Sequence, residues 1–227
     1  PPPPPPSVHA HDGIRDCTRS LVGSEMCIRD RYSEEEFAKL RLKAGRPIFG
    51  VEMKIVDDEG QELPWDGVAF GSLKVRGPWI CSSYFKLDGS DAHAEEGWFE
   101  TGDVATIDPQ GYMAITDRTK DVIKSGGEWI SSIDVENAAT DHPKVAEAAV
   151  IGRYHPKWSE RPLLIVVRSA QGQDLTKQEM LQWFEGRIAK WWTPEAVEFV
   201  DELPHTATGK IQKVKLREIF KDYSFEE

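Results

Sequence analysis

The stretch Leu203-Pro204-His205-Thr206-Ala207-Thr208-Gly209-Lys210, near the C-terminus of this 227-residue chain, decides how the remainder is interpreted. It follows an apolar, strand-like run at 196–200 and predicts a short loop, rich in threonine and glycine, that presents one lysine. A lysine on such a loop is a mobile positive charge, which suits a reaction in which negative charge builds up on oxygen atoms. The pattern is weak by itself, because a Gly-Lys turn on a surface is usually only a solvated turn.

Two motifs upstream fit the same chemistry. The first, GWFETGD at 97–103, ends in Asp103, whose carboxylate can accept two hydrogen bonds and so hold the paired hydroxyls of a ribose. The second, DRTKDVIKSGG at 117–127, contains Arg118, whose guanidinium group adds donors for the same sugar or for a phosphate. Taken alone, a Gly-Asp pair is more often a turn with a solvated aspartate. Arg118 is equally explained by a surface ion pair with Asp117 or Asp121.

Composition and charge exclude several classes of protein. The formal net charge of −11 argues against nucleic acid as a partner, because phosphate binding needs a basic face. No apolar run approaches the roughly 18 residues that span a bilayer. The N-terminus lacks the apolar core of a signal peptide, which favours a cytoplasmic location. The three cysteines, Cys17, Cys27 and Cys81, have no metal-ligand spacing, so we expect no disulfide framework and no metal site, with Cys81 packed as a small hydrophobe.

Residues 1–32 differ from the rest of the chain. Six prolines open the sequence and favour an extended, solvated helix. The segment at 20–31 resembles peptides made by translation of sequencing-adapter DNA, so this tail is interpreted as non-native or, alternatively, as disordered. We assign it no function and expect the recognisable protein to begin near Ser33, in mid-domain, as part of a truncated gene product.

A β-rich first domain is expected over residues 33–117. Ser33 and the three glutamates after it predict a capped helix start. Alternating apolar and charged residues then predict strands, and a Pro-containing turn joins the last two. The expected strands are 51–55, 71–75, 103–107 and 112–116, with the turn at 108–111. These elements predict a small barrel or a curled sheet.

A compact α+β domain is expected over residues 118–227, with the boundary near 116–120. The expected elements are a helix at 133–140 begun by Ser131 or Ser132, strands at 146–151, 163–167 and 197–199, and a final helix at 214–220. Thr176 and Glu179 predict a capping box at the start of a further helix. Behind it Met180, Phe184, Ile188 and Trp191 recur at helical spacing as an apolar packing face.

Four motifs, in this order, carry a resemblance to a known family: GSLKVRGPW at 71–79, the run at 98–103, the run at 117–127 and the loop at 204–210. Together they resemble the C-terminal half of an acyl-CoA synthetase of the adenylate-forming superfamily, over about residues 45–220. SGGEWISS at 125–132 and WWTP at 191–194 narrow the resemblance to the branch of medium- and long-chain fatty acid ligases and methylmercaptopropionate ligases. The resemblance implies the β-rich end of a large AMP-binding domain, in a small barrel-like subdomain, followed by a C-terminal lid domain.

The resemblance also implies a two-step reaction. A carboxylate attacks the α-phosphate of ATP to give an acyl-adenylate and pyrophosphate, and the thiol of coenzyme A then displaces AMP to give a thioester. By analogy Asp103 and Arg118 bind the ribose of the nucleotide, and Lys210 is the catalytic lysine of the first step. Lys120 stands at the family's hinge, about which the lid rotates between the steps.

In the rotated state the turn at 124–129 is expected to face the site of thioester formation. By the same analogy Lys124, Glu128 and Trp129 belong to this coenzyme A face. Gly126 and Gly127 would let the backbone approach the pantetheine arm closely. A surface lysine and a packing aromatic explain Lys124 and Trp129 almost equally well.

The implied cofactors and partners are ATP or AMP, coenzyme A and a small carboxylic acid, and a homodimer is compatible with the family. Mg²⁺ is expected, but its glutamate ligand belongs to a segment that does not occur in this sequence. The family's phosphate loop is also missing, so we expect the chain by itself not to catalyse adenylation. An amino-acid-activating module and a catalytically incompetent lid fragment are the competing interpretations.

Overall fold

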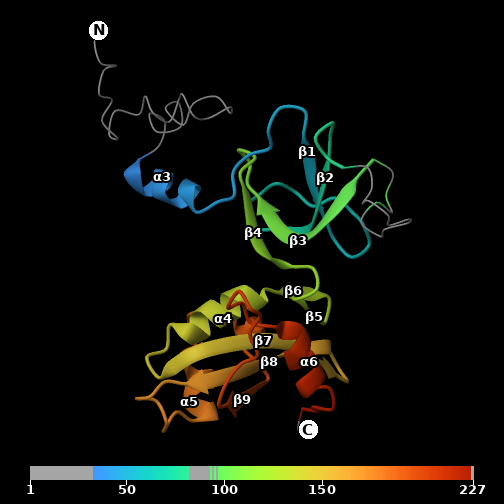
Figure 1. The fold of residues 1–227 in the computed structure, drawn as a ribbon. Helices are drawn as coiled ribbons and strands as arrows, with labels where there is room; N and C mark the ends of the chain where they lie inside the picture. The colour runs from blue at the N-terminus through green and yellow to red at the C-terminus, as the bar shows by residue number, and fades with distance from the viewer. Residues whose placement is uncertain (1–32, 82–92, 94, 96, 226–227) are drawn as a thin grey trace, which may run out of the picture. The chain divides into compact units, whose positions relative to one another are not determined.

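The computed structural model describes residues 33–81, 93, 95 and 97–225 (Figure 1). The tail interpretation of residues 1–32 therefore lies outside the described residues. The chain divides into two compact units. The first contains the residues up to Thr101 together with Ala105–Ile115, and the second contains Gly102–Val104 and the residues from Thr116 onward.

The first unit is a four-stranded sheet preceded by a helix. Its helix α3 (Glu34–Arg41) begins with the expected cap, which is a capping box in which Ser33 and Glu36 satisfy each other's backbone N–H groups. The strands are β1 (Glu52–Val56), β2 (Phe70–Arg76), β3 (Phe99–Ile107) and β4 (Met113–Arg118), paired in that order. Among the residues that the structure describes, these strands form one sheet with β1 and β4 at its edges.

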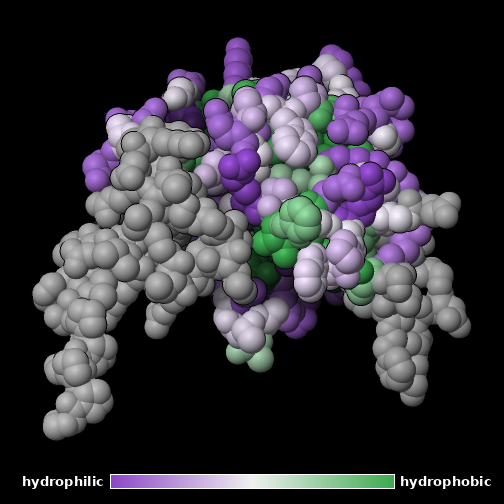
Figure 2. Space-filling view, turned by 90° about the horizontal axis from the view of Figure 1, so that it is seen from above, coloured by the Kyte–Doolittle hydropathy of each residue, from purple (hydrophilic) through white to green (hydrophobic). Residues whose placement is uncertain are grey.

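The core of the first unit is small. Among the described residues, its cluster of buried apolar side chains consists of Met53, Ile55, Leu73, Ala105 and Ile107, and Val56 and Tyr112 of the same unit are also buried. Several large apolar side chains of this unit are instead exposed: Leu42, Ile48, Phe49, Trp65, Val68 and Trp79. Figure 2 shows small hydrophobic areas among hydrophilic side chains on one face of the molecule. Because burial of apolar surface is the main stabilising term, we expect this unit to be the less stable of the two.

The second unit is built around a five-stranded sheet. Strand β8 (Ser159–Arg168) is central, antiparallel to β7 (Val145–His155) along its full length and parallel to β9 (Ala196–Val200). The hairpin of β5 (Ile123–Ser125) and β6 (Glu128–Ile130) joins the sheet where Ser125 pairs with Ser159. The sheet order is β6-β5-β8-β7, with β9 also on β8.

Helices cover both faces of this sheet. Successive residues of β7 and β8 point to opposite faces, so the two strands contribute apolar side chains to a core on each face. One core joins the sheet to α4 (Ser132–Thr140) and α5 (Lys177–Trp183), through residues such as Val150, Leu164 and Met180. The other joins it to α6 (Lys213–Ile219), through Leu216 packed with Ile151 and Leu163. The chain is thus of mixed α+β class with mostly antiparallel sheets, as the sequence predicted.

The segment after α5 differs from the expectation. The apolar face predicted from Met180 to Trp191 implied a longer helix, but α5 ends at Trp183 and only a 3-10 turn, η2 (Lys190–Trp192), follows. Gly186 has a φ of 74°, a left-handed conformation that ends helical progression. The capping box is also only half formed. Thr176 caps the Glu179 N–H, whereas the Glu179 carboxylate accepts Lys144 Nζ at 3.1 Å.

Within the described ranges, no helix combines the length and apolar character that crossing a membrane requires.

Candidate functional site

Asp103 and Arg118 lie side by side on neighbouring strands. Asp103 is in the middle of β3 and Arg118 is the last residue of β4, and Arg118 Nε is 3.3 Å from Asp103 Oδ1. The Arg118 side chain is 72% exposed and that of Asp103 is 26% exposed. A surface ion pair of this kind contributes only about 0–1 kcal/mol to stability. The Arg118 side chain is therefore accessible to a ligand, and the Asp103 carboxylate lies beside it.

The alternative ion pairs proposed for Arg118 are not formed. Asp117 is buried, and its Oδ2 accepts both the N–H and the hydroxyl of Ser132, at 2.6 and 2.7 Å. Asp121 instead pairs with Arg217 of α6. Asp117 thus anchors the end of β4 to the start of α4. The carboxylate that pairs with the Arg118 side chain is that of Asp103.

Lys120 is exposed and lies in the turn that follows β4. The N–H groups of Asp121 and Val122 both donate to the Arg118 carbonyl, at 2.8 and 2.9 Å, and close this turn. The Lys120 carbonyl accepts Arg217 Nη2 at 2.8 Å. The expected hinge residue therefore lies in a short, hydrogen-bonded turn directly after β4.

The Gly126–Gly127 turn closes the β5–β6 hairpin. Both glycines have positive φ, 59° and 88°, as a two-residue hairpin turn of type I′ requires. Lys124 and Trp129 face each other across the hairpin, with Lys124 Nζ 5.0 Å from the Trp129 ring centroid. Glu128 is exposed beside the turn, opposite Ser125. All five residues assigned to the coenzyme A face thus belong to one hairpin.

Two tryptophans that the sequence analysis did not assign to a site border this turn. Gly126 N donates to the Trp158 carbonyl at 2.8 Å, and a Cβ at Gly126 would lie 2.9 Å from Trp158 Cε3. Trp158 meets Trp191 edge to face, with 4.8 Å between ring centroids. Trp191 had been interpreted only as core packing. The signal that could have drawn attention to Trp158 is a large aromatic residue in the short connection between two apolar strands.

A buried arginine fixes this aromatic pair. Arg161 is 6% exposed and stacks 4.6 Å from the Trp191 ring. Its guanidinium group donates to the Ser125 hydroxyl and to the carbonyls of Trp191 and Thr193, and it pairs with Glu195 at 3.0 Å. Because all these partners are distributed around one planar group, the hairpin and the segment at 191–195 are held in a fixed arrangement.

Lys210 stands on a self-supporting loop. Thr206 N donates to the Lys210 carbonyl at 2.8 Å, Lys210 N donates to Thr206 Oγ1 at 3.1 Å, and Leu203 anchors the loop in the core. His205 Nε2 lies 3.2 Å from Glu147 Oε1 and ties the loop to β7. Lys210 is exposed and forms no ion pair with any other residue that the structure describes. The structure therefore brings Asp103 and Arg118 together but does not place Lys210 in contact with them.

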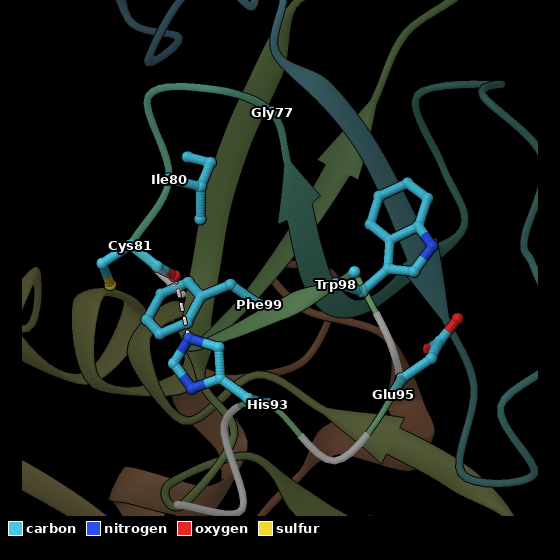
Figure 3. Close-up of a pocket in the computed structure, with 8 residues that line it drawn as sticks. Gly77, Ile80, Cys81, His93, Glu95, Trp98 and Phe99 are labelled. Atoms are coloured by element: carbon cyan, nitrogen blue, oxygen red, sulfur yellow. Dashed lines mark hydrogen bonds between the residues drawn. The ribbon is translucent and has the colours of Figure 1, made fainter. Parts of the chain in front are cut away.

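A separate pocket of about 370 Å³ lies in the first unit (Figure 3). Its lining residues include Cys81, His93 and Trp98, and His93 Nε2 is 2.9 Å from the Cys81 carbonyl. Cys81 is exposed, so the expectation that it packs as a small hydrophobe is wrong. The pocket is next to the GWF part of the 97–103 motif and does not include Asp103. The described residues contain no cluster of His, Cys, Asp and Glu that could hold a metal ion.

Comparison with known proteins identifies relatives of this chain. The family of the AMP-binding enzyme C-terminal domain matches residues 134–210. A 3-methylmercaptopropionyl-CoA ligase from Ruegeria lacuscaerulensis is 60% identical over 188 residues, which are 83% of this chain and 34% of that protein. A medium-chain-fatty-acid–CoA ligase from Ectopseudomonas oleovorans is 50% identical over 190 residues, 84% of this chain and 34% of that protein.

Solved structures of related proteins are also similar to this chain. ATP-bound MatB from Rhodopseudomonas palustris superposes with a TM-score of 0.68 at 33% identity, over 80% of this chain and 36% of that one. The o-succinylbenzoate CoA synthetase MenE from Bacillus subtilis, in complex with its acyl-adenylate intermediate, also gives 0.68 at 33% identity, over 86% and 39%. Residues 134–210 are therefore an AMP-binding enzyme C-terminal domain, and the chain is a homologue of acyl-CoA ligases, of whose length it spans about a third.

Proposed function

We propose that this chain carries the lid and the ribose-binding residues of an acyl-CoA ligase. The reaction converts a carboxylic acid and ATP into an acyl-adenylate and pyrophosphate, and then transfers the acyl group to the thiol of coenzyme A with release of AMP. The observation that carries the proposal is the contact between Asp103 and Arg118, a weak and accessible ion pair on the two strands where the family resemblance places the nucleotide.

In this proposal the two residues have complementary roles. The Asp103 carboxylate accepts hydrogen bonds from the ribose hydroxyls, and the Arg118 guanidinium group donates to the same sugar or to the phosphate. Lys210 places its ammonium group between the substrate carboxylate and the α-phosphate in the first step, where negative charge develops. Its exposure and its lack of an ion pair among the described residues keep that charge available.

For the second step we propose that the lid rotates about Lys120 and presents the β5–β6 hairpin to the thiol. Gly127 is open on its outer side, since no atom lies within 4 Å of where its Cβ would be, so a pantetheine arm could pass close to the backbone. Lys124, Gly126, Glu128 and Trp129 form the rest of this face. Mg²⁺ accompanies ATP, and we assign none of the described residues to it.

The substrate acid is a medium- or long-chain fatty acid in our leading proposal. The alternative is 3-methylmercaptopropionate, which the 60% identity to a 3-methylmercaptopropionyl-CoA ligase favours. A cytoplasmic location and a homodimer are further proposals that rest on the resemblance.

Titration of the 227-residue chain with AMP tests the nucleotide assignment. We expect Asp103→Asn and Arg118→Gln each to weaken binding by about tenfold or more, because each removes a charge-assisted hydrogen bond. Asp141→Asn is the matched control, because Asp141 is exposed and caps α4 through its backbone N–H. Binding that does not change in either site variant, or that is lost equally in the control, contradicts the assignment.

A further inference from the structure

The C-terminal helix α6 contacts the turn that follows β4 and contains Lys120. Arg217 Nη2 donates to the Lys120 carbonyl at 2.8 Å and to Asp121 Oδ1 in a short ion pair. The partners are separated by nearly a hundred residues, so the contact is a tertiary one. The Arg217 and Asp121 side chains are 29% and 23% exposed, so this pair is more shielded from solvent than the Asp103–Arg118 pair.

A second cation on the same face of α6 anchors the helix itself. Lys213 lies one helical turn before Arg217, and i, i+4 residues share a face. Its Nζ donates to Ser132 Oγ at 2.6 Å and to Glu136 Oε1 at 2.8 Å, both on α4. Leu216 of the same helix is buried in the core cluster that contains Ile151 and Leu163.

These contacts extend into one network. Ser132 also donates twice to Asp117, and Glu136 Oε1 accepts the N–H of Val150 in β7 at 2.7 Å. Burial raises the pKa of Glu136 above its usual value, and the neighbouring Lys213 ammonium group opposes that rise. The carboxylate is thus held in place by a cation and a backbone donor. The segment from Asp117 to Asp121 is fastened through α4 and α6 to the central strands.

The same helix also follows the Lys210 loop. Only Ile211 and Gln212 separate Lys210 from the first residue of α6. Gln212 N donates to the Pro204 carbonyl at 2.8 Å, so the base of the loop is closed immediately before the helix begins. One short helix therefore connects the loop that presents Lys210 with the turn that contains Lys120.

We propose that Arg217 is a positioning residue for the Lys120 hinge. Its guanidinium group holds the Lys120 carbonyl and the Asp121 carboxylate against α6. The Lys210 loop and the turn that contains Lys120 are thereby held as one body. The role as a hinge device rests on the proposed function, whereas the clamp itself is a property of the fold.

Hydrogen exchange of the 227-residue chain, without nucleotide, tests the clamp. In Arg217→Gln we expect the amides of Asp121 and Val122 to exchange about tenfold faster or more, because charge-assisted bonds that secure their turn are lost. Amides of β7 and β8 should keep the exchange rates of the unmodified chain. Arg217→Lys retains the charge but not the planar fork, and we expect an intermediate increase.

Lys215→Gln is the matched control. It removes a cation from the same helix, but Lys215 is exposed and forms no ion pair with another described residue, so exchange in the turn should not change. Unchanged exchange at Asp121 and Val122 in Arg217→Gln overturns the proposal. So does a uniform increase across β7 and β8, which would make Arg217 a general stabilising residue.

The two proposals can fail separately. If AMP binding proves independent of Asp103 and Arg118 while Arg217→Gln still loosens the turn, the nucleotide assignment fails and the clamp stands. If AMP binding depends on those residues and the turn is unaffected by Arg217→Gln, the clamp fails alone.

Discussion

Ser132 is bound twice to Asp117: its backbone N–H and its hydroxyl both donate to Asp117 Oδ2, at 2.6 and 2.7 Å. The other oxygen, Oδ1, accepts the N–H of Arg118 at 2.7 Å. One buried carboxylate therefore ends β4 and starts α4, and it fixes the backbone next to Arg118.

Asp117→Asn tests this junction. An amide presents an NH₂ group where one acceptor oxygen stands, so at least one buried donor loses its partner. We expect a loss of about 1–3 kcal/mol in the free energy of unfolding, measured by urea denaturation. Asp141→Asn, at an exposed position, should cost less than about 0.5 kcal/mol. Equal losses in the two variants would contradict the role assigned to Asp117.

The two glycines of the β5–β6 turn are expected to respond differently to alanine. Both have positive φ, so either substitution strains the backbone by about 1 kcal/mol or more. At Gly126 the added Cβ would also lie 2.9 Å from Trp158, whereas at Gly127 it would meet nothing within 4 Å. We therefore expect Gly126→Ala to destabilise the chain more than Gly127→Ala, as measured by thermal unfolding. Similar melting temperatures for the two variants would show that the Trp158 side chain moves away from the added Cβ without loss of stability.

His142 should make stability depend on pH. Its side chain is buried edge-on against Trp183, and burial holds the pKa of His142 below its usual value of 6.5. Lys144 and Arg187 lower the pKa further, and Glu179 opposes them. A lowered pKa in the folded state means that the unfolded chain binds the proton more readily, so the free energy of unfolding rises as the pH increases toward 6.5.

The measurement is urea unfolding between about pH 5 and about pH 7. In His142→Asn, whose amide oxygen can still accept the Lys144 N–H that His142 Nδ1 accepts, this part of the rise should disappear. The difference between the two chains isolates His142 from the other histidines. A variant with the same pH slope as the unmodified chain would show that burial does not disfavour the His142 cation.

Regular elements could be predicted from the sequence because their signals are local. The Ser33 capping box, the alternation in β1 and β2 and the turn at 108–111 each lie within a few residues. The helix α5 was predicted, but its length was wrong because the apolar spacing continues past its last residue, Trp183, whereas the positive φ of Gly186 prevents a helix from continuing to Trp191. The spacing of apolar residues does not predict the backbone conformation of a glycine such as Gly186.

The candidate site could be predicted only where its residues lie within recognisable motifs. Asp103 and Arg118 were expected to reach one ligand, and they are in contact. Trp158, Arg161 and Arg217 were missed because their partners are distant in sequence. Arg217, for example, acts on a turn nearly a hundred residues upstream. Arg217 and Lys215 both belong to α6, and only Arg217 contacts the Lys120 turn. The sequence of charged residues in this helix does not distinguish the two.

Transplanting this chain into a relative tests the central claim that Lys210 serves the adenylation step. The N-terminal part of the Ruegeria lacuscaerulensis ligase would be joined to the matching part of this chain, and two single-turnover reactions would be followed: adenylate formation from ATP and acid, and thioester formation from prepared acyl-adenylate. We predict that Lys210→Gln slows the first by about 10²–10³-fold and leaves the second within about twofold, while Lys215→Gln changes neither. Adenylate formation at the unmodified rate in Lys210→Gln, or an equal loss in both reactions, would contradict the account.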